Sequence, residues 1–311
     1  MKRVNAICRF GIGWLGLIAL SAPVVAQVDL SGSWSARNSS QALMDRPGPE
    51  PGPVDYLGVP LNDSGRAAAL MASDLQLSEP ERICSFYPPS YMMLGPFGLR
   101  IWNQTEPRNG ATVAWHIGGW EDLAPITIWM DGRAHPSAYA AHEMQGFATG
   151  VWQDDVLVAS FSHMRAGIVR RNLAPLSDEA TMTTWFLRHG DELTVTARIV
   201  DPVYLTQPYL LTRTFELVRT PPLPSVGQPC TESDEGVAEG AVPFYLPGKN
   251  PNMNYMTTRY GIPLAATLGG AQTMYPQYRK QLESKYVRPA KCIGNDPSDC
   301  GGPGKYPRRL F

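Results

Sequence analysis

The chain has only five histidines, and all of them lie between Trp115 and His189. Any imidazole chemistry must therefore be built inside this window. No two histidines have the HExxH spacing that holds zinc in metalloproteases, and the sequence contains neither a Gly-x-Ser-x-Gly elbow nor a Walker A loop. These absences argue against zinc proteases, against serine hydrolases of that type and against P-loop nucleotide-binding enzymes.

Basic clusters and long apolar runs are also scarce. No run of Lys and Arg is interleaved with aromatic residues, and the formal net charge of the whole chain is −1. Removal of the N-terminal segment described below would leave 24 basic residues against 28 acidic ones. We therefore expect neither nucleic acid nor an anionic membrane surface as a partner. We also expect no membrane span, because no later segment supplies the roughly 20 apolar residues that a spanning helix needs.

The N-terminus predicts a secretory signal peptide. Lys2, Arg3 and Arg9 form a positive region, and a short apolar core follows over Ile12–Leu20. Small residues then lead to a cleavage site after Ala26, and an apolar core of about ten residues is too short to span a bilayer. We expect residues 1–26 to be removed and the mature protein to be exported, in bacterial style, to the periplasm or the exterior.

Four cysteines remain after residue 26, and an even number in an oxidising compartment favours disulfide bonds. Cys292 and Cys300 bracket a turn-rich loop that can close easily, which leaves Cys84 to pair with Cys230. The alternative is a cysteine-rich metal site, but the sequence has no CxxC. We expect two disulfide bonds, with no metal and no cofactor.

Alternating apolar and polar residues predict a mainly β fold. The period of two recurs in seven segments: 99–102, 112–116, 126–130, 156–161, 181–187, 193–199 and 209–218. Turn residues stand at Gln153–Asp155 and at His189–Asp191, and the chain contains 29 glycines and 29 prolines, as proteins with many turns do. We expect an antiparallel meander that closes into a lipocalin- or calycin-like barrel, because closure removes unpaired edge strands.

The sequence divides into three regions. The signal peptide 1–26 precedes a barrel-like β domain over 27–218, and residues 219–311 form a linker rich in Pro and Gly with a disulfide-held extension. Asn62 is expected to cap a helix that reaches roughly Ser73. In the extension, the helical segments are expected at 252–260 and 278–286, and the extension should wrap the β domain.

Several segments resemble a known group of proteins. DLSGSW at Asp29–Trp34, DGRAHP at Asp131–Pro136 and GVWQDDVLV at Gly150–Val158 resemble a large group of exported bacterial proteins of uncharacterised function. That group has the pattern DLSGxW, DGRxHP and GxWxxDxLV. The opening segment is also similar to the start of lipocalin-like barrels. The resemblance implies a barrel and points to these segments, but it implies no reaction.

The candidate site consists of Asp131, Arg133, His135 and His163, which follow the ends of predicted strands. At a barrel mouth, Arg133 would bind an anionic or carbonyl oxygen and a histidine would move a proton. The alternative is a structural turn with an Asp131–Arg133 pair, in which His163 is a rim or core histidine without catalysis. For His142–Glu143 and for the Asp154–Asp155 turn, we favour ordinary loop positions.

Two functions fit these features best. The first is an exported protein that binds a hydrophobic small molecule in the barrel, with tryptophans lining or closing the cavity: Trp102, Trp115, Trp129, Trp152 and Trp185. The second is a cofactor-free isomerase, hydratase or lyase in the same cavity, with His135 or His163 as the base and Asp131 or Arg133 as its partner. A structural or envelope role, with a filled barrel and no ligand, is the remaining alternative.

Overall fold

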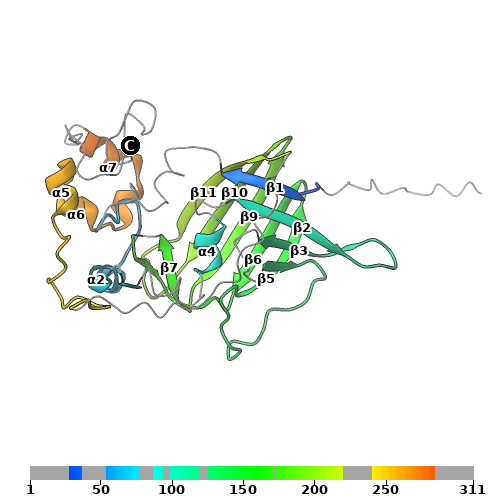
Figure 1. Cartoon of the computed structure of the whole chain (residues 1–311), viewed down its shortest axis with the longest axis horizontal. Helices are drawn as coiled ribbons and strands as arrows, with labels where there is room; N and C mark the ends of the chain where they lie inside the picture. Colours follow the sequence, from blue (N-terminus) through cyan, green and yellow to red (C-terminus); the bar gives the residue numbers. More distant parts are fainter. Residues whose placement is uncertain are drawn as a thin grey trace, which may run out of the picture.

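The computed structural model describes residues 28–36, 54–73, 75–76, 87–93, 98–118, 125–170, 172–219 and 240–283 (Figure 1). The expected signal peptide and all five cysteines lie outside these ranges, so cleavage, export and the disulfide bonds stay predictions. Within the same ranges, no helix has the length and hydrophobicity that a transmembrane segment requires.

Nine strands close into a barrel, which confirms the predicted mainly β fold. Around the barrel the strands follow the order β1-β11-β10-β9-β6-β5-β4-β3-β2. Their bounds are β1 Gly32–Ala36, β2 Leu99–Thr105, β3 Thr112–Gly118, β4 Ile126–Trp129, β5 Phe147–Gln153, β6 Val156–Ser162, β9 Thr181–His189, β10 Glu192–Val200 and β11 Tyr209–Leu217. β1 pairs with both β2 and β11, so the sheet closes on itself.

One strand pair departs from the predicted antiparallel meander. β4 pairs with β5 in parallel, with Ile128 opposite Ala148 and Trp129 opposite Thr149. A parallel pair cannot be joined by a tight hairpin, because the chain must return to the end at which the first strand began. Residues 130–146 make this return, so the segment DGRAHP belongs to a long crossover rather than to a turn at the barrel mouth.

Side chains alternate between a packed interior and the outer face. On β9, Met182, Thr184 and Phe186 are at most 2% exposed, while Leu187 on the opposite face is 46% exposed. Most interior positions of the other strands belong to the same hydrophobic core, and the inward Arg213 on β11 is a buried polar exception. The barrel is therefore filled by its own side chains.

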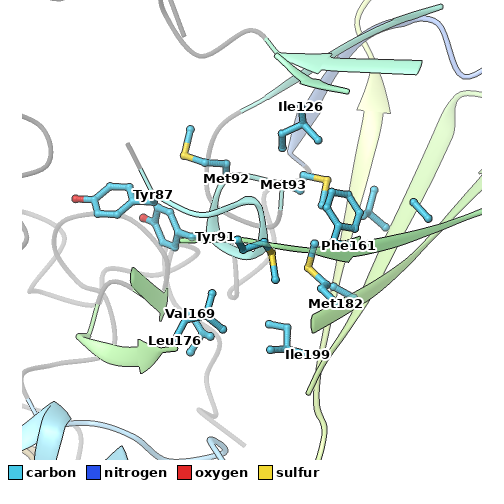
Figure 2. Close-up of a cluster of buried hydrophobic side chains, with 14 of the residues drawn as sticks. Tyr87, Tyr91, Met92, Met93, Ile126, Phe161, Val169, Leu176, Met182 and Ile199 are labelled. Carbon is cyan, nitrogen blue, oxygen red and sulfur yellow. The ribbon is translucent and has the colours of Figure 1, made fainter. Parts of the chain in front are cut away.

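A short helix and a small sheet lie at one end of the barrel. Helix α4 spans Pro89–Met92, and the two-stranded sheet consists of β7 (Gly167–Arg170) and β8 (Ala174–Leu176). At this end the interior row of barrel residues is Ala148, Phe161, Met182, Ile199 and Tyr209. Figure 2 draws α4 within the buried cluster, with Met93 on the side of Phe161.

The remaining helices gather beside the barrel, on the side of β7 (Figure 1). They are α2 (Asp63–Met71), α5 (Tyr255–Tyr260), α6 (Leu264–Thr267), the 3₁₀ helix η1 (Ala271–Met274) and α7 (Pro276–Glu283). Asn62 caps α2 as predicted, because its side-chain oxygen accepts a hydrogen bond from the amide of Gly65. The extension bonds to the segment before α2, since Tyr56 donates to the carbonyl of Thr267 and Gly270 donates to that of Val59.

A buried carboxylate fixes the connection between β10 and β11. Asp201 is 2% exposed, and it accepts hydrogen bonds from the backbone and hydroxyl of Ser177 and from the amides of Val203 and Tyr204. These bonds satisfy a charge that would otherwise be costly to bury. Asp201 therefore ties the end of β10 to the segment that leads into β9.

Candidate functional site

The crossover 130–146 is fastened to the outer face of the barrel by histidines. Thr149 on β5 and Ser162 on β6 point outward, because their neighbours Ala148 and Phe161 are buried in the interior. His135 lies between them: its Nδ1 is 2.6 Å from Ser162 Oγ and its Nε2 is 2.9 Å from Thr149 Oγ1. The crossover thus runs over β5 and β6 rather than across the barrel mouth.

The hydroxyl of Ser162 joins two imidazoles. Its oxygen is 2.8 Å from His163 Nδ1, and His163 Nε2 is 2.9 Å from the carbonyl oxygen of Ser137 in the crossover. A carbonyl only accepts, so a neutral His163 carries its proton on Nε2 and accepts the Ser162 hydroxyl proton at Nδ1. Ser162 then has only acceptor capacity left for His135, which must donate from Nδ1.

This assignment gives the whole network one direction. Because His135 donates from Nδ1, its Nε2 is an acceptor when the ring is neutral, and the hydroxyl of Thr149 donates to it. The chain therefore runs from Thr149 through His135 and Ser162 to His163, and ends at the carbonyl of Ser137. With neutral rings, each hydrogen bond of this network joins one donor to one acceptor.

His163 adopts a backbone conformation that suits this role. Its φ is +55°, in the left-handed region, which costs a residue other than glycine roughly 1–2 kcal/mol. The side-chain bonds to Ser162 and Ser137 offset this cost, and the carbonyl of His163 also accepts from the amide of Glu143. His163 thus connects the end of β6 to two points of the crossover.

The electrostatic environment favours neutral imidazole at His135. Burial lowers the pKa of His135 because it disfavours the charged form, and the neighbouring His163 lowers it further through charge repulsion. The ring of Phe147 lies edge-on, with ring centroids 5.2 Å apart. The neutral ring from which the hydrogen-bond directions were assigned is thus the form of His135 that its surroundings favour.

Asp131 and Arg133 form a separate pair at the start of the crossover. Arg133 Nε is 2.9 Å from Asp131 Oδ1, and the guanidinium lies 3.6 Å from the centroid of the Trp129 ring. The hydrogen bonds and charge of Arg133 lower the pKa of Asp131 to about 2. Both side chains are exposed. Trp129 is the register partner of Thr149, so this pair and the histidine network lie on neighbouring strands of the outer face.

The other polar positions singled out in the sequence lie elsewhere or act locally. His142 Nδ1 is 3.0 Å from the carbonyl oxygen of Met164, which pins the later part of the crossover. Asp154 and Asp155 form the turn between β5 and β6 and are exposed, as expected. His116 lies on the outer face of β3, stacked on Trp102 and 3.1 Å from Thr127 Oγ1.

The four predicted site residues are thus divided into two pairs. His135 and His163 meet through Ser162, and Asp131 pairs with Arg133. Sequence reasoning did not select Ser162, although alternation along β6 places it opposite the buried Phe161 and next to His163. The connection with Thr149 had no local signal, because it depends on the parallel β4–β5 pair.

The outer-face network can relay a proton between hydroxyl and imidazole groups, which is the elementary step of acid–base chemistry. All four ring nitrogens of His135 and His163 make hydrogen bonds that hold the crossover against the barrel. These bonds are therefore explained by a structural role. Among the residues that the structure describes, no three His, Cys, Asp or Glu side chains are placed to hold a metal ion.

The barrel interior is the second candidate region. Of the tryptophans expected to line the barrel, Trp115 and Trp152 point inward and contact each other edge to face, with ring centroids 6.4 Å apart. Trp102, Trp129 and Trp185 lie on the outer face, so the expectation is wrong for these three. Their apolar strand neighbours occupy the inward positions.

Buried polar atoms in this region lack partners within the described part of the chain. They are the indole nitrogens of Trp115 and Trp152, the hydroxyl of Thr184 on β9 and the hydroxyl of Ser90 on α4. Thr184 and Ser90 have no exposed surface. An unpaired buried polar group costs about 1–3 kcal/mol, so each one requires an explanation.

Comparisons of the chain with protein-family models, with curated proteins and with solved structures found no match.

Proposed function

We propose that this protein is exported and binds a hydrophobic small molecule inside the barrel, and that α4 is a displaceable lid at the barrel end. The observation that carries the proposal is the closure of that end by a short separate segment. Residues 87–93 contribute Tyr87, Tyr91, Met92 and Met93 to the core at exposures of 5% or less. These side chains occupy the space that an apolar ligand would take on entering between the strand ends.

The chemistry of the lid suits displacement. A helix of four residues has little stability of its own, so α4 depends on its contacts with the rest of the protein. Methionine side chains are flexible and polarisable, and they adapt to irregular apolar surfaces and to ligands. The lid can therefore exchange its contacts with the barrel for contacts with a ligand without breaking a strand pair.

The closed lid also contains a built-in cost. The hydroxyl of Ser90 is fully buried and finds no partner among the described residues. Opening the lid would expose this hydroxyl to water and recover about 1–3 kcal/mol. This cost brings the free energies of the closed and open states of the lid closer together. A ligand can enter only if the open state is populated, so a small free-energy difference favours binding.

Titration with N-phenyl-1-naphthylamine, an uncharged apolar fluorophore, tests the proposal. We expect saturable binding to the full-length protein and opposite effects of two lid substitutions. Met93→Ala removes buried contacts of the closed lid, worth about 2–5 kcal/mol, and should tighten apparent binding severalfold because the open state is more populated. Ser90→Ala removes the unpaired hydroxyl, stabilises the closed lid and should weaken binding.

The control is Leu193→Ala, which truncates a fully buried side chain of the barrel wall at the opposite end of β10, where it pairs with Phe215. It should not tighten binding. Absence of saturable binding to the wild-type protein would refute the proposed function. Equal shifts for Met93→Ala and Ser90→Ala would remove α4 from the mechanism.

A further inference from the structure

Resting on the proposed function, we infer that the ligand is an apolar molecule with a hydrogen-bond-accepting oxygen, such as a ketone, ester or carboxylic acid. Trp115, Trp152 and Thr184 would recognise that oxygen from inside the barrel. Their polar atoms have no hydrogen-bond partner in the described residues, and all three side chains point inward from β3, β5 and β9.

The tryptophans determine the polarity of the ligand group. An indole N–H donates and cannot accept, so two unpaired indoles require an acceptor on the ligand. Their rings contact each other edge to face, which brings both indoles to one part of the interior. A pure hydrocarbon would leave both donors unpaired, while a carbonyl oxygen has two lone pairs and can accept from both.

Thr184 lies in the part of the wall with the smallest side chains. Across β5, β6, β9 and β10 its interior row consists of Gly150, Ala159, Thr184 and Ala197. The next row contains larger side chains, namely Trp152, Leu157, Phe186, Val195 and Arg213. The small side chains of its own row add little bulk beside the Thr184 hydroxyl, and the Trp152 indole belongs to the adjacent row.

The specificity follows from the cost of mismatched polar groups. A site built around hydrogen-bonding groups discriminates strongly against a ligand that lacks the matching atom, because those groups then stay buried and unpaired. The inward residues around these groups are mostly apolar, and Arg213 on β11, 3% exposed and opposite the inward Val195, is a further inward polar side chain. Most of the ligand surface should therefore be hydrocarbon.

Competition against N-phenyl-1-naphthylamine tests the inference with a matched ligand pair. Butyrophenone and butylbenzene differ only by a carbonyl in place of a methylene. We expect Thr184→Val, which removes the hydroxyl at nearly constant shape, to reduce the preference for the ketone over the hydrocarbon by about fivefold. Trp152→Phe should reduce the same preference through loss of its N–H.

The control is Thr183→Val, the neighbouring position on the outer face of β9, which should leave the preference unchanged. Thr184→Val should also raise the melting temperature of the free protein, since it removes an unpaired buried hydroxyl. An unchanged preference in both Thr184→Val and Trp152→Phe, with the fluorophore still bound, would overturn this inference and leave the proposed function intact. No binding of the fluorophore to the wild type would overturn both.

Discussion

His135 shows how a single residue of the predicted site acquires a role that its sequence context does not specify. The neighbouring Pro136 favours an extended backbone, as expected, and the ring is half-buried between Thr149 and Ser162. The sequence could predict that this histidine is exceptional, because it lies in a DGRxHP segment. It could not predict its partners, which come from strands 14 and 27 residues further along the chain.

The lowered pKa of His135 predicts a loss of stability on acidification. The unfolded chain binds a proton near pH 6.5, whereas the folded state resists protonation, so the stabilisation is complete above that pH and declines as the pH falls through it. The free energy of unfolding, measured with urea, should decrease between pH 7.5 and pH 6. This decrease should be smaller for His135→Gln than for the wild type. His189→Gln, at an exposed position, should keep the wild-type decrease.

An opposing effect at Asp55 overlaps this pH window but is common to the wild type and to His135→Gln. Burial raises the pKa of Asp55 to about 6, against the attraction of Arg170. Its folded state therefore binds a proton before the unfolded chain does, and acidification through about pH 6 favours the folded state at this position in both proteins. A decrease between pH 7.5 and pH 6 that is equal in the wild type and in His135→Gln would contradict the assigned environment of His135.

At the scale of elements, local patterns predicted the hairpins and missed the crossover. The β9–β10 hairpin follows from alternation on both sides of Gly190–Asp191, and its register agrees along the whole pair. The parallel β4–β5 pair has no local signal, because it depends on the route of residues 130–146. The same cause separates the predicted site into an exposed Asp131–Arg133 pair and a histidine network.

The network predicts that Ser162 holds the crossover in place. Ser162→Ala removes the link between His135 and His163 and should increase amide hydrogen exchange at Glu143 and Arg165, whose amides bond across the crossover and the end of β6. Ser160→Ala changes an exposed outward serine two residues away and should leave that exchange unchanged. Equal exchange in the two variants would show that Ser162 does not fasten this segment.

For the whole molecule, the sequence predicts that the barrel closes more directly than it predicts which side chains fill the interior. Many short alternating strands separated by turn residues favour a closed sheet. Whether such a barrel is filled depends on which tryptophans face inward and on where α4 packs, and neither is encoded in a local pattern. Alternation did separate Thr184 from its outward neighbours, but only the strand register shows that its row is made of small residues.

Occupation of the barrel interior by a ligand can be measured by ¹⁹F NMR of protein labelled with 5-fluorotryptophan. The chain has eight tryptophans, and the described ones divide between the two faces of the barrel wall. On saturation with N-phenyl-1-naphthylamine, we expect the ¹⁹F resonances of Trp115 and Trp152, assigned by Trp→Phe substitution, to shift. Shifts confined to Trp102, Trp129 and Trp185 would place the ligand on the outer surface and refute binding in the barrel interior.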